Sequence, residues 1–219
     1  MTAAFPAPVA AGPIRKATVL ALHSSGAQLG VGLRWLDRSR PDVIRCFSPG
    51  RDLANVLISC VEEVCPAAHW PALARLAVAT GPGGFTSTRL TVVLARTLAQ
   101  QLALPLHGVG SLVLMARRLD LGGPTWLVQE LPRRGVVAGL YGPDPDRPGV
   151  MREWLAPRLH ADQAALQTLS PAPWLPAEED TEADVLALLD LAAAAHSQAM
   201  AAPWQPVLPI YPTSPVALA

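Results

Sequence analysis

The sequence has few of the residues that mark disulfide-rich or metal-binding proteins. Its 219 residues include only three cysteines, Cys46, Cys60 and Cys65, and no Cys-x-x-Cys pair. This odd number of separated cysteines argues against a disulfide scaffold and is typical of proteins in a reducing cytoplasm. The five histidines are scattered and never share a His-x-x-x-His spacing. The sequence therefore predicts no metal site.

Excess charge and long apolar runs are also missing. The formal net charge is zero and aromatic residues make up 5% of the chain. A protein that holds nucleic acid unaided usually has a basic face or a stacking platform, so we expect any RNA contact to be shared with a partner. No uninterrupted apolar stretch is long enough to predict a membrane span. Residues 1–15 are rich in Ala and Pro, lack the charged start of a secretory signal, and are predicted to form a disordered tail.

The apolar residues, 51% of the chain, follow strand and helix periods that repeat once. Each half reads β-β-β-α-β-α, which predicts an internally duplicated α/β protein. We expect an N-terminal half over residues 16–107 and a C-terminal half over 108–219. The predicted elements are strands at 18–22, 29–35, 43–47, 76–79, 106–109, 126–129, 136–141, 150–155, 173–175 and 207–211, and helices at 52–65, 86–102, 111–119, 162–169 and 181–200.

A glycine-rich loop at residues 80–84 joins a buried strand to an apolar helix. Its glycines permit backbone angles that a side chain forbids, and a loop of this kind either binds an anion or forms a tight structural turn. It lacks the Lys-Ser/Thr of a Walker loop and the third glycine of the dinucleotide fingerprint, which favours the turn. Thr86 and, further on, Ser111 are candidate helix caps. The candidate ligand-binding residues are Gly81, Gly83, Gly84, Thr86 and Arg89.

The two helices that flank this loop differ in their apolar patterns. The helix at 52–65 has one apolar stripe, whereas the helix at 86–102 is apolar nearly all round. A helix of the second kind is buried on both sides. Its second side contacts either another element of the same chain or a partner, and the sequence pattern leaves both possibilities open.

Several motifs then occur in the order found in one protein family. Residues 81–89 resemble the G-P-G-S-F-T-G-L-R signature of the bacterial TsaB (YeaZ) family. Residues 20–25 are similar to its L-A-I-D-T-S/T strand end, and residues 104–112 to its I-P-V-x-G-V-S-S-L segment. Residues 133–137 resemble part of its D-A-R-R-x-E-V-Y stretch, and residues 208–211 its closing P-x-Y-L-R. The resemblance spans most of the chain.

The resemblance implies two tandem RNase H-like halves of the actin-like ATPase (ASKHA) type and a cytoplasmic, non-catalytic scaffold. Such proteins pair with TsaD, which transfers a threonylcarbamoyl group to N6 of the adenosine next to the anticodon of tRNA. A TsaE-like ATPase docks on that pair, and tRNA is contacted only through the complex. The chain alone is expected to bind no cofactor and to be able to form a homodimer, with ATP or ADP held only at a heteromeric interface.

The resemblance also implies a helix-bundle interface in the N-terminal half. The interface residues expected from the apolar faces of its two helices are Leu53, Val56, Leu57, Cys60, Val61, Val64, Leu90, Val93, Leu94, Thr97 and Leu98. No catalytic or metal-binding residue is expected.

The chain departs from the family pattern at a chemically important position. His23 stands where the family has an Asp, and Mg²⁺ prefers carboxylate oxygen to imidazole. The substitution argues against the first alternative function, an actin-like-fold ATPase or kinase. The second alternative is a metal-independent hydrolase that uses Ser24, Ser25, Ser87 or Ser111, but no G-x-S-x-G elbow accompanies these serines.

Overall fold

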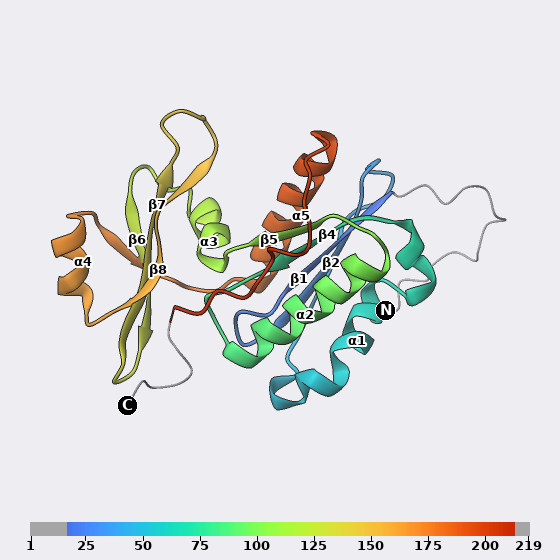
Figure 1. The fold of residues 1–219 in the computed structure, drawn as a ribbon, viewed down its shortest axis with the longest axis horizontal. Helices are drawn as coiled ribbons and strands as arrows, with labels where there is room; N and C mark the ends of the chain where they lie inside the picture. The colour runs from blue at the N-terminus through green and yellow to red at the C-terminus, as the bar shows by residue number, and fades with distance from the viewer. Residues whose placement is uncertain (1–16, 213–219) are drawn as a thin grey trace.

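The first five strands form one mixed sheet. The structure is a computed structural model that describes residues 17–212, so the predicted tail at 1–15 lies outside the described residues. The sheet has the order β3-β2-β1-β4-β5, with β1 antiparallel to β2 and parallel to β4 (Figure 1). Its strands are β1 (Thr18–His23), β2 (Leu29–Trp35), β3 (Val43–Phe47), β4 (Leu73–Ala79) and β5 (Leu106–Val109).

The second sheet repeats this topology with four strands. Its order is β8-β7-β6-β9, and β6 is antiparallel to β7 and parallel to β9. The strands are β6 (Thr125–Leu131), β7 (Gly135–Pro143), β8 (Met151–His160) and β9 (Trp174–Pro176). This order corresponds to β3-β2-β1-β4 of the first sheet, which confirms the predicted duplication.

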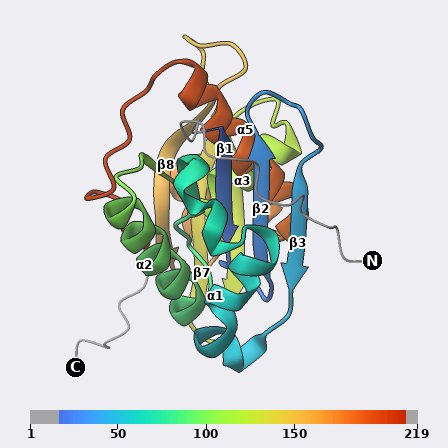
Figure 2. The same ribbon diagram turned by 90° about the vertical axis from the view of Figure 1, so that its right-hand side faces the viewer.

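Helices lie on both faces of each sheet. Helices α1 (Leu53–Val64) and α2 (Phe85–Gln101) cover the outer face of the first sheet (Figure 2), and α5 (Thr181–Ser197) packs on its other face. Helix α3 (Ser111–Leu119) lies between α5 and the second sheet (Figure 1), and α4 (Gln163–Leu169) packs beyond that sheet. None of the helices in residues 17–212 has the length and hydropathy needed to cross a membrane.

Strand β1 shows how the sequence produces two cores. Leu20 and Leu22 point to the side of α1 and α2, whereas Val19 and Ala21 point to the side of α5. Successive side chains of a strand face opposite sides of its sheet, so a continuous apolar run is buried on both faces. The first sheet is thus enclosed by helices of both halves, because α5 comes from the C-terminal half of the sequence.

Two glycines of β2 allow α5 to approach the sheet closely. A Cβ at Gly30 would lie 2.6 Å from a methyl of Val185, and a Cβ at Gly32 would lie 2.5 Å from the other. Beyond these glycines, the buried guanidinium of Arg34 donates to Asp42 at 2.9 Å and to Asp190 of α5 at 2.6 Å. Close backbone packing and a bridging cation therefore fix α5 against the first sheet.

The last part of the chain returns to the first sheet without forming the strand predicted at 207–211. The Leu106 amide donates to the Ala202 carbonyl at 2.8 Å, and the Ile210 amide donates to the Thr80 carbonyl at 2.7 Å. Pro206 and Pro209 lack the amide hydrogens that a continuous ladder needs. The prediction of a strand was wrong, but the segment does run beside the edge strand β5.

The two predicted helix caps were also wrong. Gly84 precedes α2 and Gly110 precedes α3, and neither Thr86 nor Ser111 caps a helix with its side chain. The Ser111 hydroxyl donates instead to the Ser25 hydroxyl at 2.6 Å. A long-range partner has replaced the local capping bond that the sequence pattern favoured.

Candidate functional site

The glycine-rich loop is held by backbone contacts with neighbouring elements. The Gly84 amide donates to the Ser25 carbonyl at 2.6 Å, and the Ser111 amide donates to the Gly81 carbonyl at 2.7 Å. A Cβ at Gly83 would lie only 2.2 Å from the Ser25 carbonyl oxygen. These contacts explain the glycines by close packing against the end of β1, as the structural-turn interpretation requires.

The structure does not gather the five candidate ligand-binding residues into one site. Gly81 takes a φ of +92° beside α3, and Gly83 packs on Ser25. Thr86 is exposed on the first turn of α2, and Arg89 lines a separate groove further along that helix. The only cation among the candidates therefore lies outside the turn formed by the glycines.

Serine hydroxyls next to the loop pair with one another. The Ser24 hydroxyl lies 2.6 Å from that of Thr91, and Ser25 accepts from Ser111. The Ser87 hydroxyl donates to the Gly84 carbonyl at 3.2 Å. Within residues 17–212, none of these four serines forms a hydrogen bond to a histidine that would act as a base.

His23 and Asp184 form a buried polar junction between β1 and α5. Nε2 of His23 lies 3.7 Å from Oδ2 of Asp184, and both side chains are 0% exposed. Burial lowers the pKa of His23 to about 4, so the imidazole is neutral near pH 7. Both ring nitrogens of His23 and Oδ2 of Asp184 lack a hydrogen-bond partner in the described residues.

Arg118 joins this junction to the second sheet through α3. Its Nε lies 3.3 Å from Oδ1 of Asp184, and its guanidinium donates to the Glu178 carbonyl at 2.5 Å. Burial nevertheless raises the pKa of Asp184 to about 6. The carboxylate of Asp184 thus contacts other buried groups of the chain. Within residues 17–212, no group of three or more metal-ligating side chains forms a candidate metal site.

The outward surface of α1 and α2 is narrower than the predicted interface. Leu53, Leu57, Val61, Val64 and Leu98 belong to the core of the first sheet and are at most 6% exposed. These five residues cannot form a surface, because the apolar stripes that contain them face the chain's own sheet. Val56, Cys60, Leu90 and Leu94 are half-buried, and Val93 and Thr97 are exposed.

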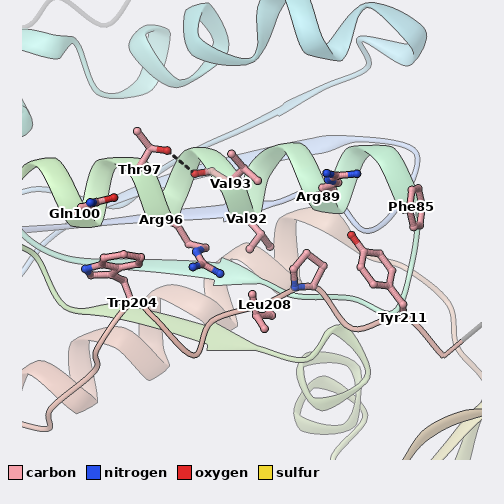
Figure 3. Close-up of a pocket in the computed structure, with 11 residues that line it drawn as sticks. Phe85, Arg89, Val92, Val93, Arg96, Thr97, Gln100, Trp204, Leu208 and Tyr211 are labelled. Carbon is pink, nitrogen blue, oxygen red and sulfur yellow. Dashed lines mark hydrogen bonds between the residues drawn. The ribbon is translucent and has the colours of Figure 1, made fainter. Parts of the chain in front are cut away.

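A groove of about 470 Å³ runs between α2 and the returning segment 204–211 (Figure 3). We call it the α2 groove. At one end, Arg96 of α2 joins the helix to the returning segment. Its guanidinium donates to the Val207 carbonyl at 3.0 Å, and its Cζ lies 5.4 Å from the centroid of the Trp204 ring. Phe85 and Tyr211 close the other end, with ring centroids 4.8 Å apart. Its lining residues are Phe85, Arg89, Val92, Val93, Arg96, Thr97, Gln100, Trp204, Leu208, Pro209 and Tyr211.

Comparison with known sequences finds relatives in one biosynthetic system. A sequence model of the family described as tRNA N6-adenosine threonylcarbamoyltransferase (TsaD) matches residues 50–129. The tRNA threonylcarbamoyladenosine biosynthesis protein TsaB of Bacillus subtilis (strain 168) is 28% identical over 159 residues, which cover 68% of this chain and 69% of that protein. The chain is similar to the TsaB (YeaZ) family.

Solved structures show the same fold as this chain. YeaZ from Pseudomonas aeruginosa has a TM-score of 0.66 at 19% identity, covering 89% of this chain and 99% of that one. A protein described as similar to peptidase YEAZ from Pseudomonas aeruginosa has a TM-score of 0.65 at 21% identity, covering 90% of this chain and all of the other. The expected fold of two tandem RNase H-like halves is confirmed.

Two features of this chain were not found from its sequence. The sequence drew attention to His23 but not to Asp184, which lies 161 positions away (184 − 23 = 161). The α2 groove combines a helix with a segment that was predicted to be a strand. The available signals were weak: an acidic residue in the first turn of a helix, and exposed apolar residues between prolines.

Proposed function

We propose that this chain is the non-catalytic partner of a TsaD-like subunit in the cytoplasmic complex that installs N6-threonylcarbamoyl on the adenosine next to the anticodon of tRNA. Its relationship to TsaB, a protein of threonylcarbamoyladenosine biosynthesis, supports the pathway. The observation that supports a non-catalytic role is the His23–Asp184 junction. Both side chains are fully buried, and His23 stands at the strand end where the family has an Asp.

The chemistry of the junction disfavours metal-nucleotide catalysis by this chain. A neutral imidazole is a poor ligand for Mg²⁺, which prefers oxygen donors. Asp184 supplies a carboxylate nearby, but it is buried and paired with Arg118. Catalysis would require these groups to leave their contacts, so we propose that nucleotide, if bound, is held at the interface with another subunit.

The outward faces of α1 and α2 are the proposed surface for the TsaD-like partner. Ile58 of α1 is 53% exposed and Val93 of α2 is 52% exposed, although both are large aliphatic residues. The two helices lie side by side on the outer face of the first sheet (Figure 2). We further propose that a TsaE-like ATPase joins the assembled pair and that the isolated chain can form homodimers.

Co-purification and tRNA analysis test this function. The tagged chain should capture a TsaD-like protein from its native cell, and deletion of its gene should deplete threonylcarbamoyladenosine in bulk tRNA. Restoring the wild-type gene should restore the modified nucleoside. Normal modification in the deletion strain, with no complex between the purified subunits, would contradict the proposal.

Titration of the purified chain with ATP and Mg²⁺ addresses the alternatives of an independent ATPase or kinase. We expect no heat of binding for the chain alone. Turnover of ATP, or of a peptide or ester substrate, by the isolated chain would instead support an enzyme. The activity would have to disappear in a variant of the chain itself, at His23 or at one of the serines Ser24, Ser25, Ser87 and Ser111.

A further inference from the structure

We propose that the α2 groove is a docking site for an acidic, apolar segment of the TsaD-like subunit, with Arg89 as the residue that recognises a carboxylate. This inference rests on the proposed function and specifies the chemistry of the partner segment. It adds the returning segment 204–211 to the contact surface. In the structure that segment forms one wall of the groove and α2 forms the other (Figure 3).

The charge of the groove indicates an acidic occupant. Arg89 and Arg96 line it, and none of the eleven described lining residues is acidic, although the whole chain has zero net charge. Arg96 already bonds to a carbonyl and covers Trp204. Arg89 is exposed and forms no ion pair within residues 17–212, so its guanidinium remains available for a bidentate contact with a carboxylate.

The apolar surface indicates a protein occupant. Phe85, Val93, Leu208 and Tyr211 are each between 41% and 59% exposed, and all line this one groove. Exposed apolar residues gathered in a concave site with arginine and aromatic residues are typical of protein–protein contacts. The wall is fixed to α2 at both ends, so docking requires little ordering of this chain.

The same contacts disfavour a nucleic acid as the occupant. Single-stranded nucleic acid binds by stacking its bases on free aromatic faces. Here Phe85 and Tyr211 pack on each other, and the guanidinium of Arg96 covers Trp204. The open residues between these ends, Val93 and Leu208, are aliphatic and offer no stacking surface.

The test measures binding of the purified full-length chain to the purified TsaD-like subunit from the same genome. We expect Arg89→Glu and Leu208→Asp each to weaken the complex by about tenfold or more. The matched controls are Arg133→Glu, on an exposed loop, and Leu169→Asp on α4, where the leucine is 60% exposed compared with 59% for Leu208. Both controls should bind within about twofold of wild type. Circular dichroism and thermal unfolding verify that each variant folds.

Salt dependence provides a second measurement. Wild-type affinity should fall as salt rises, and the slope should be shallower for Arg89→Glu because the attractive charge pair is gone. A complex that forms normally with both groove variants, or whose salt slope is unchanged by Arg89→Glu, overturns the docking proposal while leaving the proposed function intact. Failure of the wild-type subunits to bind one another contradicts the proposed function itself.

Two other occupants give distinguishable results. Light scattering measures self-association of the chain. If both groove variants lose self-association but bind the TsaD-like subunit normally, a second copy of this chain occupies the groove. Loss of binding to transcribed tRNA in Arg89→Glu, again with a normal protein complex, would identify RNA. Either result overturns the inference.

Discussion

Nε2 of His23 lies 3.7 Å from Oδ2 of Asp184, and neither side chain is exposed to solvent. Burial favours the neutral form of each group, lowering the pKa of His23 to about 4 and raising that of Asp184 to about 6. The two residues therefore contribute to the pH dependence of stability with opposite signs.

Replacement of His23 should make the protein more tolerant of mild acid. Between its folded pKa of about 4 and its unfolded value of 6.5, His23 binds more protons in the unfolded chain, so it lowers stability as pH falls. We expect the free energy of unfolding of His23→Asn, relative to wild type, to rise by about 2 kcal/mol between about pH 7 and about pH 5. Urea unfolding at several pH values measures the change. A difference that is independent of pH would contradict the buried neutral imidazole.

Replacement of Asp184 should have the opposite pH dependence. Between 3.8 and about 6, Asp184 binds more protons in the folded protein, so it raises stability as pH falls. We expect Asp184→Asn, relative to wild type, to lose about 1 kcal/mol over the same range. Asp146→Asn, an exposed carboxylate in a loop, is the control and should show a smaller change.

Gly83→Ala should destabilise the junction between the glycine-rich loop and β1. The new Cβ would lie 2.2 Å from the Ser25 carbonyl oxygen, a backbone atom that cannot rotate away. We expect a loss of about 2–3 kcal/mol in the free energy of unfolding. Gly122→Ala is the matched control, since no atom lies within 4 Å of its Cβ position and its φ is not positive. Equal stability of the two variants would show that the close approach is absent.

Arg34→Ala should destabilise the packing of α5 on the first sheet. The guanidinium is buried and bridges Asp42 and Asp190, so its removal leaves the mostly buried carboxylate of Asp42 with only the exposed Arg38, whose guanidinium lies 3.6 Å away. We expect a loss of about 3 kcal/mol. Arg34→Lys should restore only part of it, because an ammonium cannot reproduce the forked contacts. Thermal unfolding compares the two variants, and equal melting temperatures for Arg34→Ala and wild type would contradict this role.

Adjacent positions of α1 separate core from surface. Leu57 is 5% exposed and Ile58 is 53% exposed, although each lies on the same short helix. Leu57→Ala should cost about 2–5 kcal/mol by opening a cavity, whereas Ile58→Ala should cost less than about 1 kcal/mol. Chemical unfolding measures both. A large loss at Ile58 in the isolated chain would place that residue in the core and remove it from the proposed partner surface.

The element order was predictable because it depends on local patterns. The apolar pattern of the strands, the helical stripe of α1 and the glycine-rich loop all agree with the structure. Each of these patterns depends on which side chains are buried within a short stretch of the chain. The first half was predicted more accurately than the end of the chain. At 207–211 an apolar pattern between prolines indicated a strand, but the Ile210 amide makes an isolated bond to the Thr80 carbonyl and no ladder forms in the described residues.

The site was less predictable because long-range contacts decide it. The apolar stripe of α1 predicts which residues are buried but not what buries them, so Leu57 and Val61 were assigned to a partner although the chain's own sheet covers them. Ser111 was assigned to a helix cap for the same reason: its true partner, Ser25, is 86 positions away. His23 was noticed as a substitution, whereas its contact with Asp184 required the arrangement of β1 against α5.

The enclosure of the first sheet by α5 and by the segment that follows it has a consequence for biosynthesis. The strands of that sheet leave the ribosome early, but most of one face and the β5 edge are covered by α5 and the segment after it, with Leu114 of α3 adding to the same face. A nascent chain that ends before α5 therefore lacks the helix that packs on Val19, Ala21 and Ala77. The first sheet therefore becomes covered on both faces only after α5 has been synthesised, and a chain truncated before α5 would be recognised by chaperones and proteases.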